Sequence, residues 1–206
     1  DSSTIDVASA RTAHDLGAQA KMLTLDAPVS GGVVDAEGAT LTFMAGGSSV
    51  AFEKAKAVLE AMGKKVVHCG DAGAGQAAKI CNDMMLGVSM SGGGEAFGGG
   101  GGVGLSHQAL FDVASTSSGQ CWSLTTYCPV PGPVPTSPAN NGYKPGFAAA
   151  LMTKDLMLAQ EAARASGAAT PMGAEAAQLY QMFCNLGHAG DDFSGIINFI
   201  RGAKAG

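Results

Sequence analysis

The sequence predicts an α/β region followed by an all-α region. Before Gly75, helix-like and strand-like patterns alternate along the chain. After Gly75, convincing strands disappear and the composition shifts to Ala, Met, Leu, Gln and Glu, which favour helices. The 206 residues are 46% hydrophobic and 14% charged, enough apolar material for one large or two small globular units.

The first region is expected to contain a sheet covered by helices. Apolar spacing predicts helices at 6–20 and 50–62 and strands at 22–28, 40–47 and 65–69. Pro28 is expected to end a short buried strand, because proline lacks a donor for the ladder. Ser49 is the expected N-cap of the second helix.

The second region is expected to be helical around one long loop. Helix candidates lie at 76–97, 107–115, 147–166, 172–187 and 192–201. The stretch 117–146 is rich in Pro, Ser, Gly and Asn, which favours an ordered functional loop. The glycine tract at 92–104 conflicts with helix formation, since each interior glycine costs about 1 kcal/mol relative to alanine. Either tertiary packing keeps this tract helical or the helix breaks there.

Charge and cysteine usage exclude several classes of protein. A net charge of −5 without a run of basic residues provides no footprint for nucleic acid or an anionic membrane. Glycine interrupts the apolar stretches before they reach the length of a membrane span. Five scattered cysteines and four histidines without ligand spacing predict no disulfide framework and no metal site. The cysteines are interpreted as reduced thiols of an intracellular protein.

Lys79 is the candidate acid/base residue. It follows the glycine turn of Gly73 and Gly75 and begins a helix with Asn82 and Asp83 at i+3 and i+4. An ammonium with polar partners one turn away suits proton transfer to a hydroxyl or carbonyl oxygen. The alternative interpretation is a surface lysine paired with Asp83.

Ser30, Gly31 and Gly32 are a candidate carboxylate-binding loop. They follow the strand expected at 22–28 and place a hydroxyl and two unhindered amides at its carboxyl end, where α/β proteins bind ligands. An ordinary glycine turn is the alternative interpretation. Thr4 is, by local pattern, a helix N-cap, and Lys154 with Asp155 is a solvated charge pair.

Two glycine patterns match a dinucleotide-binding loop only superficially. Gly99, Gly101 and Gly104 lie in a glycine run with no strand before it. The pattern from Gly73 to Ala78 lacks a following strand that ends in an acidic ribose ligand. A cofactor-binding glycine loop is therefore not expected within this sequence.

Several segments in consistent order nevertheless match one family. The segments are Asp1–Asp6, Asp26–Gly32, Leu41–Met44 with Gly46 and Gly47, Gly73–Asn82, Ser118–Trp122 and Leu151–Leu156. Together they resemble the 3-hydroxyisobutyrate dehydrogenase group of the β-hydroxyacid dehydrogenases. The resemblance implies that residues 1–72 are the carboxyl-terminal part of an NAD-binding Rossmann domain. Residues 73–206 would then be the interdomain helix and the all-α carboxyl-terminal domain. The first part of the Rossmann domain, with its glycine fingerprint, would precede Asp1, so the fragment alone is expected to be inactive.

The resemblance also implies an activity and its residues. The family transfers hydride from a small 3-hydroxy acid, here 3-hydroxyisobutyrate, to NAD and forms methylmalonate semialdehyde in valine catabolism. By position, Lys79 would be catalytic, Ser30, Gly31, Gly32, Asn82 and Asp83 would bind substrate, and Thr4 and Lys154 would contact the cofactor. A homo-oligomer, dimer or tetramer, in the mitochondrial matrix is further implied.

One residue departs from the family pattern. The family has asparagine at the position of Asp83, and a carboxylate there favours the charged form of Lys79 and repels an acid substrate. The alternative hypothesis is a non-catalytic relative, a helical oligomerisation or scaffold module that keeps the architecture without the chemistry.

Overall fold

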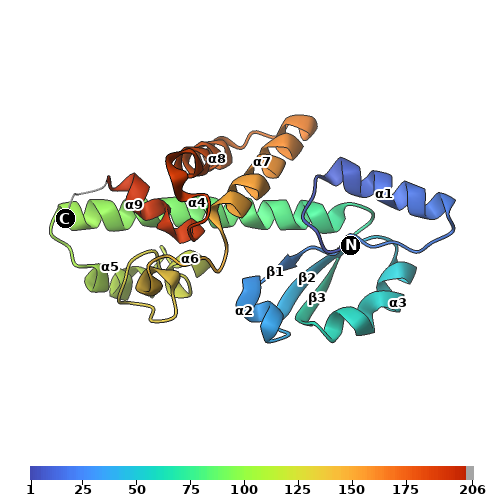
Figure 1. Ribbon diagram of the computed structural model, residues 1–206, viewed down its shortest axis with the longest axis horizontal. Coiled ribbons are helices and arrows are strands. Elements are labelled where there is room, and N and C mark those ends of the chain that lie inside the picture. The colour runs from blue at the N-terminus through green and yellow to red at the C-terminus, as the bar shows by residue number, and fades with distance from the viewer. Residues whose placement is uncertain (203–206) are drawn as a thin grey trace. The chain divides into compact units, whose positions relative to one another are not determined.

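The computed structural model describes residues 1–202, which fall into two compact units (Figure 1). Unit 1 comprises 1–83 and 158–169, and unit 2 comprises 84–157 together with the described residues from 170 onward. Helices α4 (Ala74–Gly102) and α7 (Ala149–Ser166) contribute residues to both units. The assignment of residues 1–72 to the NAD-binding domain and of residues 73–206 to the interdomain helix and the carboxyl-terminal domain stays a prediction.

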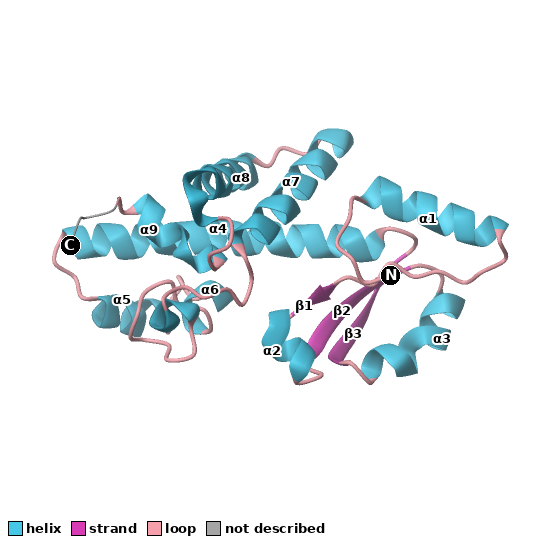
Figure 2. Ribbon diagram, viewed as in Figure 1, coloured by secondary structure: helices cyan, strands magenta, loops and turns pink. Residues whose placement is uncertain are grey.

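Unit 1 contains the sheet, as the sequence predicts. Its elements are α1 (Val7–Gln19), β1 (Val29–Ser30), α2 (Gly32–Glu37), β2 (Leu41–Gly46), α3 (Ser49–Glu60) and β3 (Gly63–Gly70). The strand order is β1-β2-β3, with β1 antiparallel and β3 parallel to β2 (Figure 2). Helix α3 packs on β2 and β3. Phe43, Phe52 and Leu59 are among the buried side chains between them.

Three local expectations in unit 1 are wrong. Residues 22–25 form no strand, because the amide of Met22 bonds to the Gly17 carbonyl (2.8 Å) and completes the end of α1. The N-cap of α1 is Asp6, whose carboxylate accepts the Ser9 amide (2.7 Å), so Thr4 is not the cap. The N-cap of α3 is Ser48, one residue before the predicted Ser49.

Unit 2 is helical, which confirms the predicted all-α region. Besides its parts of α4 and α7, it holds α5 (His107–Ala114), α6 (Trp122–Thr125), η1 (Pro138–Asn141), α8 (Pro171–Phe183), η2 (Cys184–His188), η3 (Phe193–Gly195) and α9 (Ile196–Ile200). The predicted helix at 172–187 ends as an α-helix at Phe183 and continues as a π turn containing Gly187 with φ 100°. The core of unit 2 includes Met90, Met152, Leu156 and Tyr180, all fully buried.

The glycine tract remains helical as far as Gly102. Phe97 anchors it, since this side chain is 2% exposed and packs in a cluster with Leu124 and Ile197. The added apolar burial offsets the intrinsic cost of the glycines. Of the two outcomes that the sequence allows, tertiary packing is therefore the one observed.

The proline-rich stretch is ordered by its own hydrogen bonds. The Ser137 hydroxyl donates to the Cys128 carbonyl (2.5 Å), and the Tyr143 hydroxyl donates to the Pro129 carbonyl (2.9 Å). The Asn140 side chain accepts from the Gly132 amide at 2.9 Å. The stretch is therefore an ordered loop containing α6 and η1, and its function stays a prediction.

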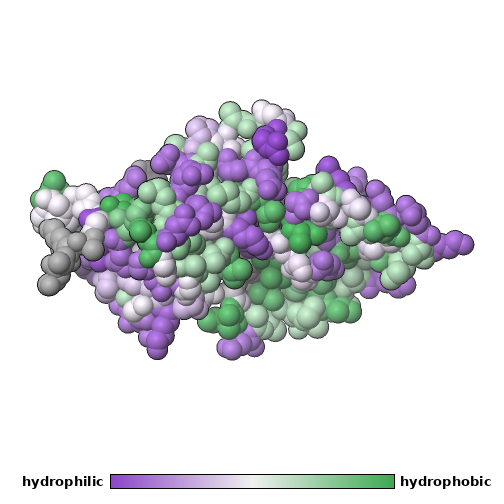
Figure 3. Space-filling view, turned by 45° about the horizontal axis from the view of Figure 1, so that its top comes forward, coloured by the Kyte–Doolittle hydropathy of each residue, from purple (hydrophilic) through white to green (hydrophobic). Residues whose placement is uncertain are grey.

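The surface mixes apolar and polar side chains. Figure 3 shows hydrophobic residues interspersed with hydrophilic ones on the face drawn. Exposed apolar side chains occur in both units, among them Leu16 (60% exposed) and Met172 (66% exposed). Within residues 1–202, none of the helices combines the length and the apolar character needed to span a bilayer.

Candidate functional site

Lys79 lies in the second turn of α4 as one half of a buried ion pair. Its Nζ is 2.7 Å from Oδ2 of Asp83, and the two residues are 7% and 1% exposed. The Asn82 amide donates to Oδ1 of the same carboxylate at 3.1 Å. Because Lys79 is buried, the interpretation as a surface lysine is wrong. Removal of either partner would weaken the compensation of a buried charge.

The turn that precedes Lys79 is built by close contact. A Cβ added at Gly75 would lie 2.5 Å from the carbonyl oxygen of Asp26, and one added at Gly46 would lie 2.6 Å from the Gly75 nitrogen. Gly73 has φ +83°, a conformation that favours glycine. These glycines let the beginning of α4 contact the end of β2 directly, which fixes where the helix starts.

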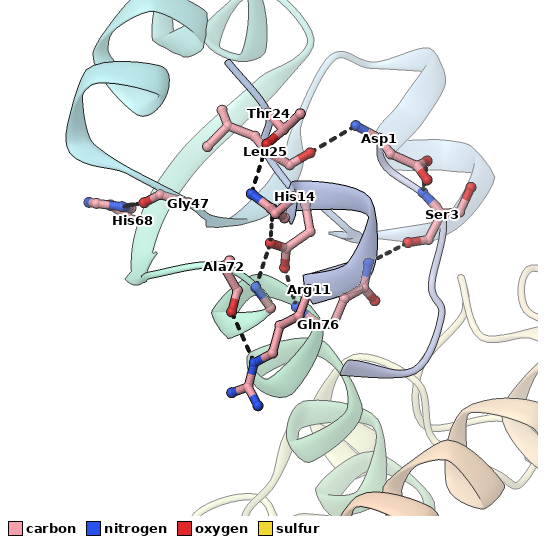
Figure 4. Close-up of polar contacts among 12 residues, drawn as sticks. Asp1, Ser3, Arg11, His14, Thr24, Leu25, Gly47, His68, Ala72 and Gln76 are labelled. Carbon is pink, nitrogen blue, oxygen red and sulfur yellow. Dashed lines mark hydrogen bonds and ion pairs between the residues drawn. The ribbon is translucent and has the colours of Figure 1, made fainter. Parts of the chain in front are cut away.

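The buried carboxylate of Asp26 caps α4. Oδ1 accepts the Gly73 amide and Oδ2 accepts the Gln76 amide, both at 2.9 Å, and Asp26 is 4% exposed. Nε2 of His14 lies 2.9 Å from Oδ1, while its Nδ1 lies 2.9 Å from the Thr24 hydroxyl (Figure 4). Since an anionic side chain already holds these amides, the interpretation of residues 73–78 as a phosphate loop is wrong.

The Gln76 side chain joins α4 to the segment that contains Thr4. Its Nε2 donates to the Ser3 carbonyl (2.7 Å) and its Oε1 accepts the Ile5 amide (3.1 Å), as Figure 4 shows in part. Gln76 is 1% exposed, so both bonds are shielded from water. The main chain on both sides of Thr4 is therefore hydrogen-bonded to a side chain of the helix that carries Lys79.

Two segments leave the sheet region in the same direction beside this turn. The Asp1 nitrogen donates to the Leu25 carbonyl (3.0 Å) and the Ala27 amide donates to the Asp1 carbonyl (2.7 Å), which is a parallel pairing opposite Asp26. Because the two segments run parallel from this pairing, the residues after Asp1 and those after Asp26 continue in the same direction. Thr4 and Ser30 are the predicted site residues on these two segments.

The serine-glycine loop differs in detail from the predicted turn. Ser30 lies in β1 opposite Thr42, and Gly31 is the N-cap of α2. Gly31 has φ 137° and Gly32 has φ 69°, conformations that side-chain-bearing residues rarely adopt. The turn from β1 into α2 therefore requires glycine at these two positions. The predicted role of these residues in binding substrate stays a prediction.

Lys154 belongs to unit 2. It lies on α7 with its Nζ 3.1 Å from Oδ1 of Asp155, and its side chain is 46% exposed whereas that of Asp155 is 2% exposed. The interpretation as a charge pair is correct, although one member of the pair is buried. Its contact with a cofactor stays a prediction.

The amino terminus of α4 does not fit a pyrophosphate, because Asp26 accepts two of its amides. Dinucleotides bind outside the carboxyl ends of parallel strands. Thr4 is the residue of unit 1 that is predicted to contact the cofactor, and this contact stays a prediction.

A thiol near this site is kept in its protonated form. Burial, and then the negative charge of Asp26, raise the pKa of Cys69. A raised pKa lowers the thiolate fraction and hence the reactivity of the sulfur. All five cysteines are free thiols.

Three residues of this arrangement have no role predicted from the sequence. His14, Asp26 and Gln76 form the contacts around the first turn of α4. The one signal in the sequence is that the residue before α4 is Gly73 rather than Ser, Thr, Asp or Asn, so its own side chain cannot cap the helix.

Two family models together cover nearly the whole chain. Residues 1–70 match the NAD-binding domain of 6-phosphogluconate dehydrogenase. Residues 73–200 match the domain described as NAD-binding of NADP-dependent 3-hydroxyisobutyrate dehydrogenase. Both are NAD-binding domains, which confirms the predicted cofactor class.

Individual relatives agree with these models. A probable 3-hydroxyisobutyrate dehydrogenase of Mycobacterium tuberculosis is 54% identical over 98% of this chain and 68% of its own length. The mitochondrial 3-hydroxyisobutyrate dehydrogenase of Homo sapiens is 44% identical, over 98% of the chain and 60% of its own length. An NAD-dependent L-serine dehydrogenase of Pseudomonas aeruginosa is 47% identical over 93% of the chain and 64% of its own length.

The fold comparison gives the same result. The structure of the Mycobacterium tuberculosis 3-hydroxyisobutyrate dehydrogenase with L-serine matches with a TM-score of 0.95, at 54% identity, over 98% of this chain and 69% of that one. The predicted remainder of a Rossmann-type domain followed by a helical domain is confirmed. On both sequence and fold, the chain belongs to the 3-hydroxyisobutyrate dehydrogenase family of NAD-dependent oxidoreductases.

Proposed function

We propose that the protein that carries this chain transfers hydride between a small 3-hydroxy acid and NAD. The first candidate substrate is 3-hydroxyisobutyrate, oxidised to methylmalonate semialdehyde as a step of valine catabolism. The names of relatives at 44% to 54% identity support this substrate. The observation that carries the proposal is the buried, ion-paired Lys79 on a helix turn that is fixed against the segment of Thr4.

Each proposed residue has a definite task. In the oxidation, the substrate loses the hydride from its carbinol carbon and the proton from its hydroxyl, and bound NAD supplies the hydride acceptor. In its neutral form, Nζ of Lys79 takes the hydroxyl proton, and the resulting ammonium returns a proton in the reduction. Ser30 with the amides of Gly31 and Gly32 binds the substrate carboxylate. Asn82 and Asp83 complete the substrate-binding set.

Cofactor binding is proposed for two residues. Thr4 is proposed to contact the nicotinamide end, and Lys154 is the second proposed cofactor contact. We propose NAD rather than NADP, as in the P. aeruginosa relative named NAD-dependent. Calorimetric titration with each dinucleotide tests this choice. Tighter binding of NADP than of NAD would contradict it.

L-Serine is a second candidate substrate, because Asp83 favours it. Serine is a 3-hydroxy acid with an ammonium group, which a carboxylate at position 83 attracts, although the pairing of Asp83 with Lys79 weakens this attraction. One relative is an L-serine dehydrogenase, and one matched structure was solved with L-serine. The test is the ratio of kcat/KM for L-serine to that for 3-hydroxyisobutyrate, which Asp83→Asn is expected to lower. An unchanged ratio would remove Asp83 from substrate selection.

The role of Lys79 has a direct test. Lys79→Ala is expected to lose most of the turnover while the protein remains folded, since general acid/base groups contribute about a hundredfold or more to the rate. Turnover is followed by the absorbance of the reduced nicotinamide, and folding by circular dichroism. Near-normal turnover of Lys79→Ala would show that the assigned role is wrong.

The scaffold hypothesis is distinguished by binding. NAD titrated into the 206-residue chain and into a longer form that spans the length of the relatives should bind the longer form. Absent binding in both would favour a non-catalytic relative. The predicted dimer or tetramer is checked on the same samples by light scattering, and a monomer would contradict it.

Location is proposed from the relatives. The relatives from Dictyostelium discoideum, Drosophila melanogaster and Homo sapiens are named mitochondrial, whereas those from Mycobacterium are bacterial proteins. We therefore propose the mitochondrial matrix for the protein in a eukaryotic cell. Fractionation of mitochondria tests the proposal, which fails if the protein is recovered outside them.

A further inference from the structure

One buried carboxylate determines where α4 begins. Asp26 accepts three hydrogen bonds or ion-pair contacts at 2.9 Å, from His14, from the Gly73 amide and from the Gln76 amide. A helix leaves its first amides without partners, and a carboxylate is favoured at this positive end. The cap lies 47 and 50 residues away in sequence from the two amides that it binds. The start of α4 is therefore held by tertiary structure.

The imidazole of His14 is fixed from both sides. The Thr24 hydroxyl lies 2.9 Å from Nδ1, and Oδ1 of Asp26 lies 2.9 Å from Nε2 (Figure 4). His14 comes from α1 and Thr24 from the segment that leads to Asp26. The contact thus adds a third restraint to the Asp26 side chain, because His14 bonds to the same oxygen, Oδ1, that accepts the Gly73 amide.

The next residue that bonds to Asp26 also bonds to the Thr4 segment. Gln76 uses its main-chain amide on Asp26 and both side-chain groups on Ser3 and Ile5. Lys79 follows Gln76 by three residues, which is about 4.5 Å along the helix axis. Movement of Gln76 would therefore move Lys79 and Thr4 relative to each other.

We infer that His14, Asp26 and Gln76 are positioning residues for the proposed hydride transfer: they set Lys79 against the segment of Thr4. The inference rests on the proposed function. None of the three needs to touch the reacting atoms. Their effect arises because displacement of a reacting group by about 1 Å can slow a reaction about a hundredfold.

The test compares Gln76→Met with a control in the same unit. Methionine matches glutamine in length and removes both side-chain bonds. The control is His68→Leu, which removes one side-chain bond to the Gly47 carbonyl (2.7 Å) and the stacking of the ring on Phe52, but no bond of His14, Asp26 or Gln76. Both are assayed, together with Asp26→Asn, for kcat, KM, thermal midpoint and the primary deuterium isotope effect on kcat with substrate labelled at the carbinol carbon.

A positioning role predicts that kcat per folded molecule falls in Gln76→Met and Asp26→Asn by more than about fivefold relative to His68→Leu, with a raised isotope effect. A purely structural role would lower the thermal midpoint only. A fall of fivefold or less, or an unchanged isotope effect, overturns the inference. If Asp26→Asn does not fold, Gln76→Met decides. Loss of activity in Lys79→Ala combined with control-like behaviour of Gln76→Met would leave the proposed function intact and refute the positioning role.

Discussion

The two ends of α4 use glycine in opposite ways. At its amino-terminal end, a Cβ on Gly75 would lie 2.5 Å from the Asp26 carbonyl oxygen. In the glycine tract, Gly92, Gly99 and Gly101 have no atom within 4 Å of an added Cβ. A cavity of about 380 Å³, lined in part by Gly92 and Gly93, lies beside the tract. Gly75 has no room for a methyl group, whereas Gly92, Gly99 and Gly101 have.

The two ends therefore have different structural requirements. The amino-terminal end must hold its backbone in one position, whereas the tract must only remain helical. Close backbone approach at Gly75 lets Asp26 cap α4 and fixes the turn that carries Lys79. The tract needs only to remain helical, and Phe97 provides the burial that it requires. We conclude that the amino-terminal end of α4 is constrained by its sequence, whereas Gly92, Gly99 and Gly101 are not required by local geometry.

Phe97→Ala should have the largest effect on stability. Removing this buried ring should lower the free energy of unfolding by about 4 kcal/mol, because the tract loses its main anchor and a cavity is left. Urea unfolding followed by circular dichroism measures the change. A loss below about 1 kcal/mol would mean that something other than Phe97 keeps the tract helical.

Gly75→Ala should come next. The added methyl meets main-chain atoms that cannot rotate away, so we expect a loss of about 3 kcal/mol in the free energy of unfolding together with reduced turnover. The matched control is alanine at an open position of the same helix. A neutral Gly75→Ala would show that the contact with Asp26 is not tight.

That control is itself a prediction of the opposite sign. Gly99→Ala and Gly101→Ala should each stabilise the protein by about 1 kcal/mol, because both positions are exposed, helical and free of contacts. Turnover should be unchanged. Destabilisation by either change would indicate that the tract is packed against something, for instance another copy of the chain.

The smallest expected effect concerns the cap of α1. Asp6 directly precedes the helix that it caps, whereas Asp26 is distant in sequence from α4. Hydrogen bonds from Ser9, through its hydroxyl and its amide, lower the pKa of Asp6. A lowered folded-state pKa contributes stability above the unfolded-state value, about 3.9, which is lost as the pH falls through the folded-state pKa. Asp6→Asn keeps a capping residue and removes the charge. The free energy of unfolding of Asp6→Asn should be slightly lower than that of the wild type at pH 6, and this difference should shrink below about pH 4. A deficit independent of pH would contradict this assignment.

Local contacts were predictable from the sequence and distant ones were not. The i,i+4 spacing of Lys79 and Asp83 predicted their pairing, because a helix places such residues on one face. The cap of α4 by Asp26 was not predictable, since it joins residues far apart in the chain. The strand expected at 22–28 did not form: the end of α1 takes the Met22 amide, and within this range only Asp26 forms a bridge, with Gly46. Helix propensity alone could not decide the fate of the glycine tract, which depends on what packs against Phe97.

Single-turnover transfer of hydride to bound NAD tests the central claim most directly, since it reports the chemical step without product release. With Lys79→Met in the protein that carries this chain, we expect a rate lower by about a hundredfold or more, with the Kd for NAD unchanged. A rate within threefold of wild type, with NAD bound, would contradict the claim that this buried lysine transfers the proton.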